Sequence, residues 1–422
     1  MGRNGPGYDV VVIGLGLAGL MAGLAAAGRG ARTLVVGRGH GTLRFRAGTI
    51  DVLGYRDGRL VAAPGPAVAA LAGAAPEHPY ALAAADLATS LDAVRGAAEA
   101  ASLPLDGSLD ANLLVATAAG TLRPACLAPA SLAADWPDAS VLAVGLAGYR
   151  DFQAELVARV LPEAAARHGL RLACRALTID IPALHRRHLD GLALARGFED
   201  GGLRREVIAA LRGHLDGVSL VALPAVLGLG RAGDVRAGLV RELGLPVVEL
   251  PSLPPSVPGI RLELALTAAL RRAGGVVQVG PGARVGPERG EIRWVELAAA
   301  GHPVRVPAGR VVLASGGLAS GGLALTMDGA FVETVAGLPV PAPEAVDRLY
   351  GTAFLSEAGH PAHRAGVRVD ARLRPVGDGG EPVRPNLFAA GGLLAAADRA
   401  LERSADGIAC ATGWRAGLEA AA

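Results

Sequence analysis

The chain contains no lysine, because all 41 residues counted as lysine or arginine are arginine. A lysine Schiff base, attachment of pyridoxal phosphate and a Gly-Lys-Ser/Thr phosphate loop all need lysine, so all three are excluded. Cysteine is also scarce. Cys126, Cys174 and Cys410 lie far apart and form no Cys-x-x-Cys pair, so the sequence predicts neither an iron–sulfur cluster nor a metal site. Free thiols of this kind suit a reducing cytoplasm.

A large excess of one charge is lacking as well, since the formal net charge of the 422 residues is +2. Without a clustered basic tract, a nucleic-acid surface is not expected. The uncharged run from Val10 to Gly28 approaches the length of a membrane span, but five glycines interrupt it. A buried strand followed by a buried helix explains the same apolarity. Residues 1–7 lack a separate apolar segment and a cleavage site, so no signal peptide is expected.

The most informative segment that is present is an apolar strand, Tyr8 to Ile13, which runs into a glycine turn and an Ala/Leu-rich helix. In this pattern Gly14 suits the tight turn, Gly16 close approach to a phosphate, and Gly19 close packing of the helix on the strand. An anion is then favoured at the helix N-terminus by its N–H groups and dipole. The segment predicts a nucleotide-binding fold of the Rossmann type.

A second predicted strand, Arg32 to Val36, returns at the spacing of a βαβ unit. Dinucleotide folds usually place an acidic residue after this strand to bind the adenosine ribose. This chain instead has Gly37-Arg38-Gly39, and its next carboxylate is Asp51. One interpretation is a shorter cofactor, FMN. In the other, backbone groups or Arg38 contact the ribose of FAD. We favour FMN, with FAD as the alternative.

Changes in composition predict the domain organisation. Ala/Leu-rich helices broken by proline and glycine dominate residues 64–250, which indicates an insertion. The expected fold class is therefore α/β: a Rossmann-like FAD/NAD(P)-binding flavoprotein fold with an inserted, cap-like α/β domain. We expect residues 1–63 to form the first part of the nucleotide-binding domain and residues 251–422 its second part.

Two later segments are predicted to be further strands of the nucleotide-binding domain. One begins at residue 310 and ends at Ser315-Gly316, and the other begins at residue 385 and ends at Gly391-Gly392. A helix is predicted after the second. In flavoproteins such a helix start faces the ring edge where negative charge develops on reduction. The segment from residue 42 to residue 53 would wrap the flavin ring. The residues expected to contact the cofactor are Gly14, Gly16, Gly19, Gly37, Arg38, Arg46, Gly48, Ser315, Gly316, Gly391 and Gly392.

Short matches in a fixed order carry a family resemblance. Besides the opening glycine motif, they are Arg46-Ala47-Gly48-Thr49-Ile50-Asp51, Ala75-Pro76-Glu77-His78-Pro79-Tyr80, Gly120-Thr121-Leu122-Arg123-Pro124, Asp151-Phe152-Gln153-Ala154, the loop from Leu253 to Arg261, Leu313-Ala314-Ser315-Gly316, Ser320-Gly321-Gly322-Leu323 and Asn386-Leu387-Phe388-Ala389. Nearly end to end, the chain resembles the B subunit of the anaerobic glycerol-3-phosphate dehydrogenases. It departs from the family between Glu402 and Cys410, where the family has a stretch like Gly-Cys-Gly-Gly-Gly.

The resemblance implies an FMN-type flavoprotein subunit that works with a larger FAD-containing catalytic subunit and an iron–sulfur, membrane-anchoring subunit. Together they would oxidise glycerol 3-phosphate to dihydroxyacetone phosphate and pass electrons to quinone in anaerobic respiration. The expected location is the cytoplasm, with a peripheral position on the inner face of the membrane through a partner subunit.

Oxidation of a secondary alcohol needs a base beside the hydride acceptor in a site that excludes water. Histidine is the natural base, and the candidates are His78 in the inserted domain and His363, near His360, before the last strand. A structural or surface role is the competing interpretation, because the chain has nine histidines. The arginines that could clamp a phosphate are Arg44, Arg46, Arg123 and Arg261.

Two other functions stay open from the sequence. The chain could be a structural or docking subunit whose flavin site is vestigial, an interpretation that the missing ribose acid and the altered segment at Glu402 favour. It could also be a stand-alone flavin oxidoreductase of the fumarate-reductase type, because arginine-rich sites suit a small carboxylate equally well. The intact glycine turn favours a redox-active flavoprotein over a docking subunit. Such a flavoprotein would either reduce its own flavin with the substrate or relay electrons from its partner within the multi-subunit complex.

Overall fold

The computed structural model describes residues 7–185, 189–286, 290–298, 301–354 and 356–422. Contacts divide the chain into two compact units. The first unit consists of Met1–Thr42, Asp51–Ala97 and Leu266–Ala422, and the second of Leu43–Ile50 and Ala98–Ala265. The domain boundaries predicted after residues 63 and 250 stay a prediction.

The first unit is built on a seven-stranded sheet in the order β13-β2-β1-β16-β15-β14, with β20 also paired to β16. The pairs among β13, β2, β1, β16 and β20 are parallel, and β14 and β15 are antiparallel. This confirms the predicted α/β class and its first strands. The strands are β1 (Tyr8–Ile13), β2 (Thr33–Gly37), β13 (Val276–Val279), β14 (Ala283–Val285), β15 (Trp294–Leu297), β16 (Val304–Leu313) and β20 (Leu387–Ala389).

The register aligns the ends of the central strands. Ile13, the last residue of β1, lies opposite Val36 of β2 and Leu313 of β16. Leu313 in turn lies opposite Ala389, the last residue of β20. Because the paired strands are parallel, the turns that follow them leave the sheet at one edge. In open α/β sheets this carboxyl edge is where ligands bind.

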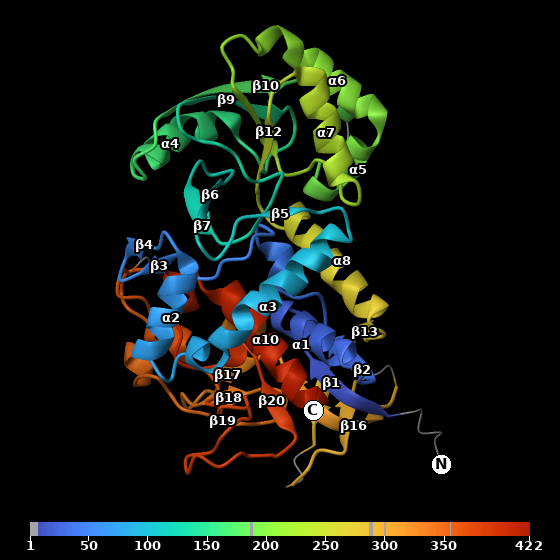
Figure 1. The fold of residues 1–422 in the computed structure, drawn as a ribbon, viewed down its shortest axis with the longest axis vertical. Coiled ribbons are helices and arrows are strands. Elements are labelled where there is room, and N and C mark those ends of the chain that lie inside the picture. The colour runs from blue at the N-terminus through green and yellow to red at the C-terminus, as the bar shows by residue number, and fades with distance from the viewer. Residues whose placement is uncertain (1–6, 186–188, 287–289, 299–300, 355) are drawn as a thin grey trace. The chain divides into compact units, whose positions relative to one another are not determined.

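Two helices that cover the sheet pack against each other through close backbone contact. Helix α1 (Leu17–Gly28) follows the turn after β1, and α10 (Ala405–Ala421) packs along it, blue beside red in Figure 1. A Cβ atom at Gly417 would stand 2.2 Å from the carbonyl oxygen of Ala22. Glycine is therefore what lets the two helices approach this closely.

Most of the remaining elements of the first unit lie to the left of this sheet in Figure 1. Three short strands form a separate antiparallel sheet in the order β17-β18-β19, and β3 pairs with β4. These elements are β3 (Tyr55–Arg56), β4 (Arg59–Leu60), α2 (Pro64–Ala74), α3 (Pro79–Glu99), β17 (Leu323–Leu325), β18 (Phe331–Glu333), β19 (Pro339–Val340) and α9 (Arg399–Glu402). Helix α3 ends in the second unit, and α8 (Val257–Arg272) begins in the second unit and ends in the first.

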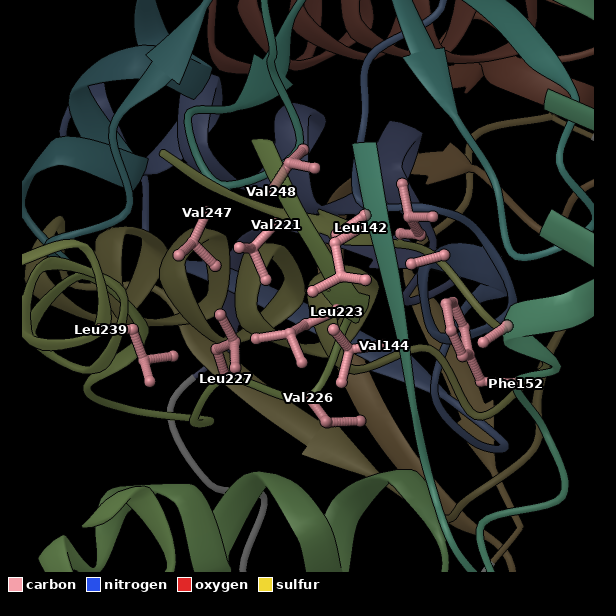
Figure 2. Close-up of a cluster of buried hydrophobic side chains, with 14 of the residues drawn as sticks. Leu142, Val144, Phe152, Val221, Leu223, Val226, Leu227, Leu239, Val247 and Val248 are labelled. Atoms are coloured by element: carbon pink, nitrogen blue, oxygen red, sulfur yellow. The ribbon is translucent and has the colours of Figure 1, made fainter. Parts of the chain in front are cut away.

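The second unit has its own parallel sheet in the order β10-β9-β11-β12. Figure 2 shows how side chains of β9, β11, β12 and α7 meet in its apolar core. The elements are β5 (Leu105–Asp106), β6 (Leu113–Ala116), β7 (Leu122–Ala125), β8 (Ala128–Pro129), β9 (Ala139–Leu146), α4 (Ala154–Ala166), β10 (Leu172–Ile179), α5 (Gly191–Glu199), α6 (Gly201–Leu211), β11 (Leu220–Pro224), α7 (Ala232–Leu243) and β12 (Val247–Leu250).

The apolar run from Val10 to Gly28 is divided between β1 and α1, as predicted. Within the part of the chain that the structure describes, no helix combines the length and the apolarity needed to cross a membrane.

Replacement of Gly417 tests the contact between the two helices. Gly417→Ala is expected to lower the free energy of unfolding by roughly 1–3 kcal/mol, because the added methyl group overpacks the interface. Gly96→Ala in α3 is the control, since a Cβ atom there would meet no other atom within 4 Å. It should be neutral or stabilise by up to about 1 kcal/mol through helix propensity. Equal changes for the two variants in urea unfolding would contradict the close approach.

Candidate functional site

Two of the three glycines in the opening motif are required by the fold itself. Gly14 has φ +130°, and a Cβ atom there would lie 2.1 Å from the carbonyl oxygen of Ala314. A Cβ atom at Gly19 would lie 1.9 Å from the carbonyl oxygen of Gly14. These contacts place the end of β1 against the end of β16 and the start of α1 against the turn.

Gly16 is different, because nothing in the chain requires glycine there. Its backbone is extended at φ −76°, and a Cβ atom would meet no atom of the chain within 4 Å. Gly16 is the N-cap of α1, where no side chain caps the helix and no acidic residue stands in the first turn. A phosphate group that approaches the backbone at the helix N-terminus fits this arrangement.

The loop after β2 borders the same turn. A Cβ atom at Gly37 would lie 3.2 Å from the backbone nitrogen of Leu15, and one at Gly41 would lie 2.3 Å from Cα of Gly16. Arg38 is exposed, and its Nε atom is 3.1 Å from where a Cβ atom of Gly282 would stand. The loop therefore offers backbone groups and an arginine in place of the usual carboxylate.

The later predicted segments meet at this edge of the sheet. Gly391 has φ +71°, its Cβ position is 2.5 Å from Cβ of Ala18 at the start of α1, and its N–H donates to Thr412 Oγ1 at 2.9 Å. A Cβ atom at Gly317 would lie 2.9 Å from the carbonyl oxygen of Gly392. Ser315 and Gly316 lie between the end of β16 and Gly317. The buried Oγ atom of Ser315 has no hydrogen-bond partner, and Gly316 has φ +84°.

Arg46 and Gly48 belong to the second unit. Gly48 has φ +76°, and a Cβ atom there would lie 2.6 Å from the carbonyl carbon of Pro258, so packing within this unit explains the glycine. Of the proposed phosphate clamps, Arg44 is bound to Glu263 at 2.6 Å, and Arg261 is bound to Glu249. A contact of Arg46 or Gly48 with the cofactor stays a prediction.

The two candidate bases differ in their surroundings. His78 is buried, its Nδ1 accepts from the Tyr80 N–H at 3.1 Å, and its Nε2 lies 3.2 Å from Glu402 Oε2. Because Nδ1 accepts, Nε2 carries the hydrogen and donates to Glu402. His363 is about one third exposed, and its Nδ1 lies 3.5 Å from Asp398 Oδ1 without a hydrogen bond.

Both histidines thus face carboxylates at the two ends of the four-residue helix α9. Burial raises the pKa of Glu402, but hydrogen bonds from His78 and Ser404 outweigh it and leave the pKa below its ordinary value. Asp398 caps α9 by accepting from the Leu401 N–H at 3.2 Å. These carboxylates and Arg399 between them were not predicted from the sequence. The only signal was the departure from the family pattern at Glu402.

The second unit contains another glycine loop with the same spacing, which the sequence analysis also missed. Gly228-Leu229-Gly230-Arg231-Ala232-Gly233 joins β11 to α7. Here Oε1 of Glu199, at the end of α5, accepts from three successive N–H groups at 2.8, 2.6 and 2.9 Å. A carboxylate of the chain itself therefore binds where a phosphate would bind in the first unit. The spacing alone does not distinguish the two loops.

Among the described residues, no group of three or more His, Cys, Asp or Glu side chains is placed to hold a metal ion. Burial raises the pKa of Cys174 to about 11, so its thiol is protonated at neutral pH.

Comparisons with known proteins show which family the chain resembles. Residues 9–405 match a family described as FAD binding domain. The probable B subunit of the anaerobic glycerol-3-phosphate dehydrogenase of Halobacterium salinarum is 34% identical over 98% of this chain and 97% of the relative. The B subunit of the anaerobic glycerol-3-phosphate dehydrogenase of Pectobacterium carotovorum is 33% identical over 92% of each chain. Among solved structures, the open conformation of a flavocytochrome c3 fumarate reductase is 10% identical, covers 99% of this chain and 79% of that chain, and has a TM-score of 0.46, too low to support an argument.

The Glu199 contacts predict a pH-dependent contribution to stability. Burial raises the pKa of Glu199, but the N–H groups of Arg231, Gly230 and Leu229 outweigh it, so the pKa is lowered. A lowered pKa stabilises the fold above the unfolded value of about 4.3, and this stabilisation is lost as the pH falls through the folded value. Glu199→Gln should lower the free energy of unfolding at pH 7 by roughly 1–2 kcal/mol, because hydrogen bonds to a charged group are replaced by neutral ones.

The measurement is urea unfolding of wild type and Glu199→Gln between pH 3 and pH 7. The difference should shrink below about pH 4. Exposed Glu163 in α4 provides the control, and Glu163→Gln should leave stability unchanged at every pH. A Glu199→Gln difference that is constant with pH would contradict a role for the charge.

Gly16 provides the test of the cofactor site. Gly16→Val should remove the bound yellow chromophore and leave a folded chain, because the side chain would fill the space that a phosphate needs. Gly28→Val at the other end of α1 is the control, since its Cβ would also meet no atom within 4 Å. Absorbance at equal protein concentration and circular dichroism give the result. Full chromophore content in Gly16→Val would defeat the assignment.

Proposed function

Because the chain belongs to the family of B subunits of the anaerobic glycerol-3-phosphate dehydrogenases and contains an FAD binding domain, we propose that it oxidises glycerol 3-phosphate to dihydroxyacetone phosphate as a flavin-dependent subunit. The observation that carries the proposal is Gly16. It is the one glycine of the opening motif that packing does not explain, and it stands at the N-terminus of α1, where a cofactor phosphate is favoured.

The choice of flavin is part of this proposal. The matched family supports a flavin, and its description favours FAD. The loop after β2 favours FMN, because it provides no carboxylate for an adenosine ribose between Gly37 and Gly41. We keep FMN as the first expectation and FAD as the alternative.

When bound, the flavin would accept the hydride of the alcohol. The chain must remove the hydroxyl proton, and the histidine contacts favour His363 for that role. Both ring nitrogens of His78 are already engaged, by Tyr80 and Glu402, which suits a residue that positions α9. His363 keeps an Nδ1 atom without a hydrogen bond and has part of its side chain exposed.

The relatives are named as subunits, which supports a multi-subunit enzyme. In this proposal the partners are a larger FAD-containing catalytic subunit and an iron–sulfur subunit that anchors the complex to the membrane. Electrons would pass through the complex to quinone. The chain itself would stand at the cytoplasmic face of the membrane.

The test combines cofactor identification with reduction. The full chain is produced with its partner subunits, separated from them and heated to release its own chromophore for mass measurement, and both the separated chain and the native complex are mixed anaerobically with glycerol 3-phosphate. Wild-type flavin should bleach. His363→Gln should slow the bleaching by roughly 100-fold or more at equal flavin content. His302→Gln, on an exposed residue, is the matched control.

The possible results separate the alternatives. FMN would support the short-cofactor proposal, and FAD would show that the adenosine is held without a ribose acid. A normal rate in His363→Gln would remove that residue as the base. Absence of flavin would make the chain a docking subunit, and a flavin that glycerol 3-phosphate reduces in the complex but leaves oxidised in the separated chain would make it a relay for electrons from its partner.

A further inference from the structure

Arg261 shows what a buried guanidinium needs, whereas Arg399 is only partly buried. Arg261 is 4% exposed, and its Nη1 and Nη2 atoms lie 2.6 and 2.9 Å from the two oxygens of Glu249. Its Nε donates to the carbonyl oxygen of Gly228 at 2.8 Å. This is the expected pattern, because a charge removed from water is costly unless an opposite charge and hydrogen bonds compensate it.

Arg399 in α9 lacks such a partner. Its Nη1 donates to the carbonyl oxygen of Leu394 at 2.9 Å, and its Nη2 to that of His363 at 3.4 Å. No described carboxylate comes within the 4.0 Å of an ion pair. Burial lowers the pKa of Arg399, although Glu402 and Asp398 raise it from a distance.

The nearby carboxylates form hydrogen bonds elsewhere through Glu402 and through Oδ1 of Asp398, whereas Oδ2 of Asp398 forms none. Glu402 accepts from Ser404 Oγ at 2.6 Å and is bound to His78, whereas Asp398 Oδ1 accepts from the Leu401 N–H. A guanidinium carries five N–H groups in a planar fork. Both of its hydrogen bonds described above are to neutral carbonyl oxygens, so Arg399 is influenced by Glu402 and Asp398 only from a distance and forms no ion pair with a described carboxylate.

The guanidinium of Arg399 lies near the carboxyl edge of the first unit's sheet, where the cofactor is proposed to bind. Nη2 of Arg399 is 3.6 Å from where a Cβ atom of Gly317 would stand, and that Cβ position is 2.9 Å from the carbonyl oxygen of Gly392. The guanidinium therefore lies beside the two loops that follow β16 and β20. Three buried polar atoms of the same region have no hydrogen-bond partner: Ser315 Oγ, His363 Nδ1 and Asp398 Oδ2.

We propose that Arg399 binds the phosphate group of a phosphate monoester substrate. The planar fork of arginine matches two phosphate oxygens, and the dianion would supply the opposite charge that the described residues do not. Because the His363 carbonyl oxygen accepts from Arg399, the phosphate would be held close to the residue proposed as the base. This inference rests on the proposed function and names the residue that gives it substrate specificity.

The experiment measures binding without turnover. The flavin-loaded full chain is titrated by calorimetry with the product dihydroxyacetone phosphate and, separately, with inorganic phosphate, for wild type, Arg399→Gln and Arg399→Lys. Arg399→Gln should weaken product binding roughly 10- to 100-fold, the loss expected for charge-assisted hydrogen bonds. Arg399→Lys should fall between, because it keeps the charge without the fork. The control is Arg364→Gln, since Arg364 is exposed beside His363.

The outcomes keep this inference apart from the proposed function. Unchanged product affinity in both Arg399 variants, or no wild-type affinity for product and phosphate, would overturn it, while reduction of the flavin in the full complex could still succeed. Loss of flavin from Arg399→Gln with a normal melting temperature would assign the guanidinium to the cofactor phosphate and also overturn it. If Arg399→Gln does not fold, Arg399→Lys decides, because equal affinity there would exclude bidentate phosphate binding.

Discussion

The first unit depends on a close contact between backbone atoms, made possible by glycines that carry no side chain. At the end of β1, Gly14 lies against the carbonyl group of Ala314, and Gly19 of α1 lies against Gly14. No side chain fits at either glycine, so the strand, the turn and the helix are fixed at a separation that only backbone atoms allow. The same closeness leaves Gly16 at the helix N-terminus with space in front of it. The fold and the proposed phosphate site are therefore consequences of one constraint.

Polar groups that stabilise the fold have an opposite charge within the chain, whereas polar groups suited to bind a ligand lack one. In the second unit, Glu199 binds the N–H groups of its glycine loop and Glu249 binds Arg261, so both polar groups are satisfied by the chain. In the first unit, the corresponding groups are the N-terminus of α1 and the guanidinium of Arg399. Neither finds a carboxylate among the described residues. Binding a small anion costs least where the protein has not already supplied one.

The sequence predicted the parallel core well, because β1 and β2 contain continuous apolar runs and β16 ends in one, Val311 to Leu313, with turn residues behind them, a local signal. The histidine environments could not be predicted in this way. His78 and Glu402 are 324 residues apart, and their contact depends on the completed fold. The two glycine loops also could not be distinguished from the sequence, because their glycine spacing is identical. They differ in that the N–H groups of the second loop are bound by Glu199, a residue outside the loop. The placement of Arg46 and Gly48 against the cofactor stays a prediction for the related reason that it depends on long-range packing.

The sheet order also has a consequence for synthesis of the protein on the ribosome. Strand β1 is made first, but its neighbour β16 ends at Leu313 and the helix against α1 ends at Ala421. The central strand of the first unit must therefore wait for most of the chain before its sheet can close. The second unit comes mainly from one continuous stretch, Ala98–Ala265, whose parallel strands are all available much earlier. Until β16 has been made, the apolar strand β1 can pair on one side only, with β2, and its open edge is exposed to aggregation during that period.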